Sequence, residues 1–250
     1  MSDRTIQGEG TAEADWLIWL SGRRTPQLTA QEIFATNRRL VVIAPHPDDE
    51  ILACGGLLAL AAKANFPVVV VAVTEGEASH GVADGYRRSI LREQRENERS
   101  AGLIELGIDP ACVVSLKIPD GDVARNIYQI FRQLNHLFQM GDVIVTTWFQ
   151  DGHPDHEATA QAVRLTGCKL LQAPVWMWHW AKPADKKVPW VNLVVTSLTD
   201  GAMQAKQNAL SKHHSQFARR SSQPEPVLVP SIVKRSERRH EYFFIRNNCF

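Results

Sequence analysis

The chain has 250 residues, and its 28 Lys and Arg against 27 Asp and Glu give a formal net charge of +1. Its length and its apolar content of 44% predict one large globular α/β domain. The charge balance excludes a general electrostatic attraction to nucleic acid or to an anionic membrane. No stretch approaches the ~18 apolar residues needed to cross a bilayer, and no basic leader precedes an apolar run, so we expect no membrane span. The sequence leaves a homo-oligomer open.

The cysteines are widely scattered and form no C-x-x-C pair. This spacing is not typical of a redox motif or of a sulfur-ligated zinc site. Reduced thiols, and therefore a cytoplasmic protein, fit it best. The four cysteines are Cys54, Cys112, Cys168 and Cys249.

Residues 1–38 are predicted to form a helical extension that packs on the outside of a domain over residues 39–250. Trp16 and Trp19 lie at helical spacing with neighbouring leucines. Thr29 and Glu32 have the spacing of a capping box, which predicts a helix start at this point.

After the extension, apolar runs alternate with helical stretches. This alternation predicts strand–helix units with right-handed crossovers, and therefore a Rossmann-like α/β fold with a mostly parallel sheet flanked by helices. In such sheets the ligand site lies beyond the carboxyl ends of the strands. The expected buried parallel strands are 40–44, 68–73, 113–116, 143–147 and 191–196. The expected helices are 57–64, 89–106, 124–139 and 157–165.

One histidine and three acids crowd the loop that follows the first strand, with the sequence Pro45-His46-Pro47-Asp48-Asp49-Glu50. The two prolines stiffen the backbone, and adjacent carboxylates repel one another unless a cation or a proton transfer offsets the repulsion. His46 and Asp49 can bind one metal ion from this loop and leave a neighbouring carboxylate to act on water. The alternative is a helix N-terminus that attracts acids through its dipole.

A second loop of the same kind follows the strand at 143–147, where His153, Asp155 and His156 open a helix. Two strand-end loops thus present imidazole and carboxylate groups toward one place. Catalytic zinc takes three protein ligands and keeps a fourth position for water. His46, Asp49 and one histidine of the second loop satisfy that count.

The two motifs, PHPDDE at 45–50 and HPDH at 153–156, resemble the signatures of the PIG-L/LmbE-like family, whose members remove acetyl groups from N-acetylglucosaminyl compounds. The resemblance extends over residues from about 40 to 217. It includes Arg95-x-x-Glu98, Pro119-Asp120-Gly121 and the segment 206–216. Some members have a tyrosine two residues before the first histidine of HPDH, where this chain has Asp151.

By position, the resemblance implies that His46, Asp49 and His156 bind Zn²⁺. It implies that Asp48 is the general base and that His153 stabilises the developing oxyanion. The spacing alone does not separate these roles.

The resemblance also implies substrate-binding residues and supporting residues. Arg95, Asp120 and His213 would bind substrate, while Glu50 and Asp155 would orient the histidines and the loop. For Arg95 the alternative is an exposed ion-paired helix face, and for Asp120 it is an ordinary tight turn.

Trp176, Trp178 and Trp180 alternate along an expected strand, which would place three indoles on one face and His179 on the other. Core packing is the usual role of such a stripe, and stacking on a sugar is the alternative.

The function that these expectations favour is a zinc-dependent hydrolase that removes the acetyl group from an N-acetylated amino sugar. Its alternatives are an amidase for a larger acyl group, a hydratase on the same metal site, and a metal-binding protein without catalysis.

Overall fold

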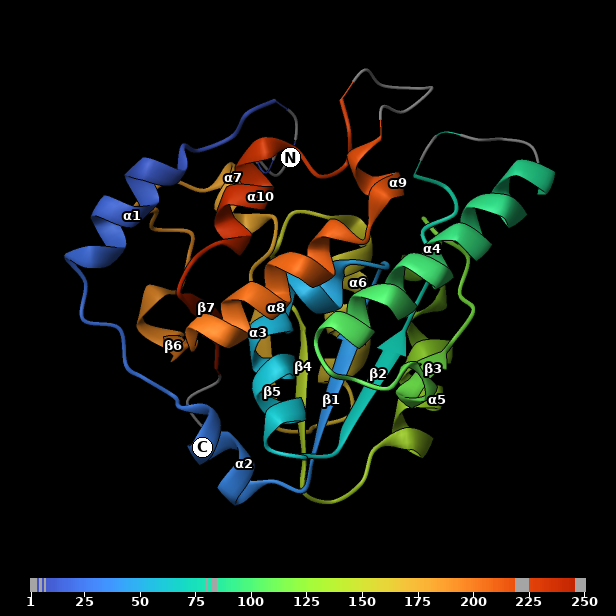
Figure 1. The fold of residues 1–250 in the computed structure, drawn as a ribbon, viewed down its shortest axis with the longest axis horizontal. Helices are drawn as coiled ribbons and strands as arrows, with labels where there is room; N and C mark the ends of the chain where they lie inside the picture. The colour runs from blue at the N-terminus through green and yellow to red at the C-terminus, as the bar shows by residue number, and fades with distance from the viewer. Residues whose placement is uncertain are drawn as a thin grey trace.

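The computed structural model describes residues 4, 6, 8–79, 81, 85–218 and 225–245. Over these residues the chain forms one seven-stranded sheet with helices on both faces (Figure 1). The strand order across the sheet is β3-β2-β1-β4-β5-β7-β6. The strands are β1 (Arg39–Ala44), β2 (Val68–Ala72), β3 (Val113–Ser115), β4 (Asp142–Thr147), β5 (Leu170–Ala173), β6 (Leu193–Ser197) and β7 (His240–Phe244).

The helices alternate with the strands along most of the chain, and short 3₁₀ turns lie at Pro110–Cys112, Val123–Asn126 and Trp190–Asn192. The α-helices are α1 (Glu13–Ser21), α2 (Ala30–Thr36), α3 (Asp49–Lys63), α4 (Gly85–Glu105), α5 (Ile127–Leu137), α6 (Pro154–Arg164), α7 (Met177–Trp180), α8 (Asp200–Ser211), α9 (His214–Phe217) and α10 (Pro230–Ser236). None of these described helices combines the length and apolar character that crossing a bilayer requires.

The sheet confirms the predicted fold class and corrects one detail of it. Strands β3, β2, β1, β4 and β5 pair in parallel, as the apolar runs indicated. The expected strand at 191–196 is β6, and its described sheet partner is β7, which runs antiparallel to both β5 and β6. The sheet is therefore mixed at this edge rather than parallel throughout.

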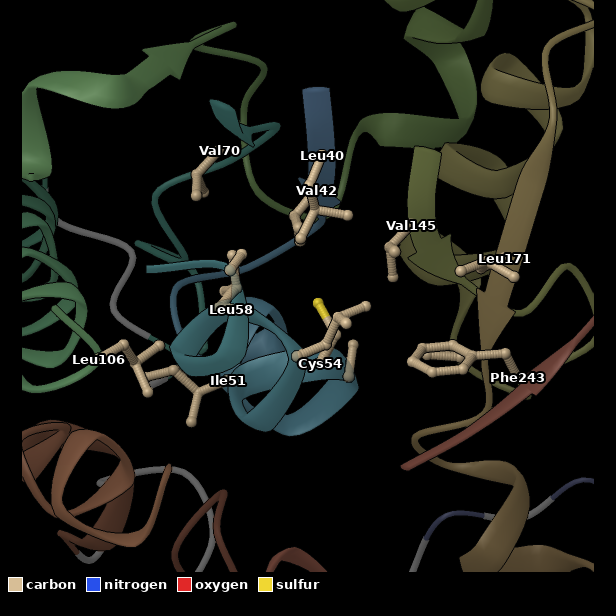
Figure 2. Packing of buried hydrophobic residues seen from close by; sticks show 14 of the residues in the cluster. Leu40, Val42, Ile51, Cys54, Leu58, Val70, Leu106, Val145, Leu171 and Phe243 are labelled. Carbon is tan, nitrogen blue, oxygen red and sulfur yellow. The ribbon is translucent and has the colours of Figure 1, made fainter. Parts of the chain in front are cut away.

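Alternate residues of the central strands face opposite layers of helices. Leu40 and Val42 of β1 belong to a core cluster that includes residues of α3, and Figure 2 shows them beside Leu58 and Cys54 of that helix. Val41 belongs to a second cluster that contains residues of α5 and α6. Fully burying each Val or Leu contributes roughly 1.5–3 kcal/mol, so the two layers fix the strand ends on which the site depends.

The N-terminal helices pack on the sheet domain. Trp16 of α1 is fully buried, and its Nε1 donates a hydrogen bond to the carbonyl of Trp178 at 2.8 Å. The capping box at the start of α2 is confirmed, because the Thr29 side chain accepts from the Glu32 backbone and Glu32 accepts from the Thr29 backbone. The division of the chain at residue 38 stays a prediction.

The tryptophan stripe does not form a strand, so this prediction was wrong. The chain turns into helix α7 directly after Trp176, and the three indoles separate. Trp178 is buried edge-on against Trp16, with ring centroids 4.9 Å apart, while the Trp180 Nε1 donates to the carbonyl of Asp151 at 2.7 Å. Trp176 alone of the three lines the cavity at the two motif loops described below.

Candidate active site

The two predicted loops meet because they leave neighbouring strands. β1 and β4 pair in parallel, with Ile43 opposite Thr146, and both loops begin at their carboxyl ends. β2 lies on one side of this pair and β5 on the other, so the strand order reverses here. This is the topological switch point at which open α/β sheets bind ligands.

The first loop holds a strained residue. Asp48 has φ 127° and ψ −26°, a region that residues other than glycine rarely adopt. Such a conformation costs of order 1–3 kcal/mol and persists only where the surroundings impose it. Here Thr74 Oγ1 donates to the carbonyl of Pro45 at 2.8 Å, and Gln216 Nε2 donates to that of Pro47 at 3.0 Å. The strain turns Asp48 and Asp49 toward the cavity, which both residues line.

The three predicted metal ligands lie together. Asp49 Oδ2 lies 3.2 Å from His46 Nδ1 and 3.1 Å from His156 Nε2. Ligand atoms at the ~2.0–2.1 Å bond lengths of tetrahedral zinc stand roughly 3.3 Å apart, and both contacts of Asp49 are close to this spacing. Among the described residues, two groups have donor atoms within 4.8 Å of one another, namely His46, His153 and His156, and His46, Asp120 and Asp155. Asp49 is in neither group, so its place in the ligand set stays a prediction.

The other ring nitrogen of each predicted histidine ligand, His46 and His156, faces a carboxylate. His46 Nε2 lies 3.1 Å from Asp155 Oδ2 and 3.4 Å from Asp120 Oδ1. His156 Nδ1 lies 2.8 Å from Asp151 Oδ2. Such carboxylate–histidine pairs fix the ring and its tautomer, and leave the remaining nitrogen free to bind a metal. The donor set therefore fits a metal centre on the evidence of its own hydrogen bonds.

The electrostatics of the site favour a cation. Burial alone would lower the pKa of His156, but Asp49 and Asp151 raise it to about 9. The pKa of Asp49 is far below its usual range, because the two histidines outweigh the effect of its burial. Because a histidine binds a metal only when its ligating nitrogen is deprotonated, metal binding at His156 would release its proton.

Asp151 is a residue that the sequence reasoning did not select. It is fully buried, and besides His156 its carboxylate accepts from the backbone N–H groups of Val175, Trp176 and Met177 at 2.9–3.0 Å. It therefore joins a metal ligand to the start of α7. Two signals pointed to it, namely its place just before HPDH and the tyrosine that some relatives have instead.

Replacing Asp151 by Asn should weaken zinc binding by about 10–100-fold, the usual effect of losing a carboxylate behind a ligating histidine. With its oxygen at the Oδ1 position, the Asn side chain can still accept from the backbone N–H groups of Val175 and Met177. The amide nitrogen at the Oδ2 position cannot accept a hydrogen bond from the His156 ring. Zinc affinity measured by competition with a chelator is the test. Asp185→Asn, at a turn outside the described cavity, is the control. An unchanged affinity in the Asp151 variant would contradict the orienting role.

His153 is placed as a neutral donor. Burial, His156 and His46 lower the pKa of His153 to about 3, so its ring is neutral at pH 7. Its Nδ1 accepts from the backbone N–H of Asp155 at 3.2 Å, so the proton resides on Nε2. Since His153 lines the cavity, this N–H is available to an oxygen of a bound ligand.

Arg95 and Asp120 also line the cavity. Arg95 is 1% exposed, so an exposed ion-paired face does not describe it, and its Nη1 and Nη2 donate to the carbonyl of Gly76 and to Gln216 Oε1. Asp120 lies in a turn whose Gly121, at φ 84°, donates its N–H to Asp155 Oδ2. Burial opposes ionisation of Asp120, yet contact with His46 lowers its pKa to about 2. Gln216 also lines the cavity and was not singled out as a site residue.

His213 and Glu50 lie behind the cavity rather than on its surface. His213 is fully buried, and burial, Arg95 and Arg99 lower its pKa to about 3. Glu50 is fully buried, its Oε2 accepts from the backbone N–H of Asp48 at 3.3 Å, and burial raises its pKa to about 7. Glu50 therefore supports the strained loop, and a substrate contact by His213 stays a prediction.

The chain is similar to curated bacterial proteins over about half its length. One is a "Probable N-acetyl-alpha-D-glucosaminyl L-malate deacetylase 2" of Bacillus subtilis, 27% identical over 128 residues, which are 50% of this chain and 58% of that protein. Its counterpart in Bacillus cereus is 29% identical over 135 residues, covering 50% and 59%. The match thus spans less than two thirds of the length of these relatives.

Solved structures share the fold. The zinc-inhibited form of a teicoplanin deacetylase matches with a TM-score of 0.57 and 19% identity, over 72% of this chain and 85% of that one. An N,N'-diacetylchitobiose deacetylase of Pyrococcus horikoshii matches with a TM-score of 0.54 and 19% identity, over 76% and 74%. The PIG-L family, described as GlcNAc-PI de-N-acetylase, matches residues 41–166, which contain both motif loops. The chain belongs to the PIG-L family.

Proposed function

We propose that this protein is a zinc-dependent N-deacetylase that removes the acetyl group from an N-acetylated amino sugar. The observation that carries the proposal is the placing of Asp48 and His153 beside the three ligands His46, Asp49 and His156, with all five lining one cavity of about 450 Å³. That volume lies in the range of small-molecule sites. The named activities of the relatives support an acetamide as the reacting group.

His46, Asp49 and His156 would hold zinc through one carboxylate oxygen and two imidazole nitrogens. When bound, zinc lowers the pKa of a coordinated water and polarises the acetamide carbonyl. Carboxylates behind the two histidines would keep the imidazole rings oriented. Asp155 and Asp120 contact His46, and Asp151 contacts His156.

Asp48 and His153 carry out the proton transfer and the charge stabilisation. The Asp48 carboxylate accepts the proton of the attacking water as the new C–O bond forms, and this proton then passes to the amine nitrogen. The C–N bond breaks, and acetate and the free amino sugar leave. His153 Nε2–H donates to the carbonyl oxygen as that oxygen gains negative charge, and a neutral ring does so without a change of protonation state. In the metal-free protein, burial and Asp49 raise the pKa of Asp48, and a bound cation opposes both effects.

The direct test is acetate release from N-acetylglucosaminides by the zinc-loaded protein. Matched N-propionyl and N-butyryl glucosaminides distinguish a deacetylase from an amidase for larger acyl groups. A faster reaction on a longer acyl chain, or no reaction on any of these amides, would overturn the proposal.

We expect one zinc per chain, and we expect His46→Ala combined with His156→Ala to abolish it, because two of three ligands are removed. Elemental analysis of protein purified without added metal measures the stoichiometry. His136→Ala, on α5 away from the described cavity, is the control. Full zinc retention in the double variant would mean that the metal binds elsewhere.

A further inference from the structure

The cavity has a polar side and an apolar side. The acids and histidines of the two motif loops form the polar side. The apolar side, called the apolar wall below, consists of Ile6, Leu52, Trp176, Val227, Leu228 and Val229. Leu228 is part of the core cluster that covers α3, and Leu52, Trp176 and Val229 pack against that cluster. These four of the six wall residues are therefore backed by the core.

Apart from Leu52, the apolar wall comes from segments outside the family match. Ile6 precedes the first matched residue, while Trp176 and residues 227–229 follow the last one at 166. Leu228 is held in place by its backbone N–H, which donates to the carbonyl of Gln216 at 3.0 Å. The wall can thus set specificity without altering the metal centre.

Charge on the described cavity lining argues against an acidic ligand group. Among the described lining residues Arg95 is the only Lys or Arg, and its Nη1 and Nη2 are already bonded to Gly76 and Gln216. The carboxylates on this lining, by contrast, are Asp48, Asp49, Asp120, Asp155 and Glu225. A substrate carboxylate placed against the wall would lose its water, and no Lys or Arg of the described lining is free to pair with it. Burying an unpaired charge costs free energy of binding.

We propose that the amino sugar taken by this enzyme carries an uncharged, apolar aglycone that packs on the apolar wall. The inference rests on the proposed function and narrows its substrate class. It separates this protein from the Bacillus relatives, whose name specifies a malate conjugate. Trp176 is the anchor, because its ring lies at 24° to that of His153, with centroids 6.5 Å apart, and so links the wall to the catalytic side.

The test compares two substrates with the same sugar and different aglycones. The zinc-loaded full chain is assayed for acetate release from phenyl N-acetylglucosaminide and from N-acetylglucosaminyl malate. We expect kcat/KM to favour the phenyl compound by at least about tenfold, the lower end of what hydrophobic contacts discriminate. An equal or greater kcat/KM for the malate compound would overturn the inference while leaving the deacetylase function intact.

A binding measurement with the reaction products distinguishes a failure of the aglycone inference from a failure of the proposed deacetylase function. Calorimetry with the two deacetylated products, phenyl glucosaminide and glucosaminyl malate, requires no turnover. If neither substrate releases acetate, the deacetylase proposal fails, and the binding order of the products still decides the aglycone question. Tighter binding of the phenyl product supports the apolar aglycone, and equal or weaker binding overturns it.

Two variants test the wall itself. Val227→Arg places a cation on the wall and should lower the phenyl-to-malate ratio of kcat/KM at least about tenfold. Trp176→Ala should raise KM for the phenyl compound more than it lowers kcat, since a ground-state contact is lost. Val191→Arg, at a site that is 82% exposed and outside the described lining, is the matched control and should leave the ratio unchanged. A ratio unaffected by both wall variants would assign specificity to another surface.

Discussion

Replacing Asp48 by Asn should leave zinc bound and lower kcat by about 10²–10⁴-fold, the usual contribution of general acid–base catalysis. The amide keeps the shape of the side chain and removes its ability to accept a proton. The proposed zinc ligands should be unaffected, because the carboxylate of Asp49 contacts His46 and His156. Zinc content and acetate release, measured on the same preparation, test both halves of the prediction.

Asp49→Asn is the matched variant, one residue along the same loop. It should lose zinc rather than only turnover, since Asp49 Oδ2 lies between His46 and His156.

The acidic limb of the pH–rate profile should report a macroscopic pKa of the coupled carboxylate and water, which belongs to no single residue. If Asp48→Asn loses zinc and Asp49→Asn keeps it, the two roles are exchanged. Near-normal turnover with zinc bound in both variants would place the proton acceptor elsewhere.

The position of the site could be predicted from the sequence because it depends on local signals. Each motif loop directly follows an apolar run in the sequence. These two runs form the buried parallel strands β1 and β4. The meeting of the two loops then follows from the topology of a doubly wound sheet. The full strand order was not needed to predict the position of the site.

The elements that were missed or mistaken depend on contacts between distant residues. β7 completes the sheet between β5 and β6, and its sequence HEYFF was not among the expected strands. The tryptophan stripe has the alternation of a strand, yet the Asp151 carboxylate accepts three successive backbone N–H groups before α7. A helix start therefore replaces strand pairing there. No local pattern reveals an acceptor 24 to 26 residues away.

The same limit applies to the supporting residues of the site. Arg95 has the neighbours of a solvated helix face, but α4 packs on α8 and α9, and its guanidinium is buried against Gln216. The charge pattern of the helix alone could not show this. Gln216 and Pro47 are 169 positions apart in the sequence, so only the folded chain shows how the strained loop is held.

Glu241→Gln should lower the free energy of unfolding by about 3–5 kcal/mol, the cost of leaving one charge of a buried pair without its partner. α3 is interrupted at Cys54, which has φ −154° and ψ 30°. Glu241 accepts from the backbone N–H groups of Gly56 and Leu57 at 2.7 and 2.9 Å, and Lys206 Nζ donates to its Oε1 at 2.7 Å. The Lys206 and Glu241 side chains are only 4% and 1% exposed, so water cannot replace either partner.

Urea unfolding followed by circular dichroism measures the effect, with an unchanged m-value expected if only stability changes. Glu241→Gln combined with Lys206→Met removes both charges and should recover part of the loss, because no unpaired buried charge remains. Asp200→Asn is the control for a surface pair, since Asp200 and its partner Arg239 are 83% and 66% exposed, and it should change stability little. If Glu241→Gln proves as mild as Asp200→Asn, the interruption of α3 is held by packing alone.

The first turn of α3 carries Asp49, so a large loss of stability in Glu241→Gln should be accompanied by weaker zinc binding at temperatures well below unfolding.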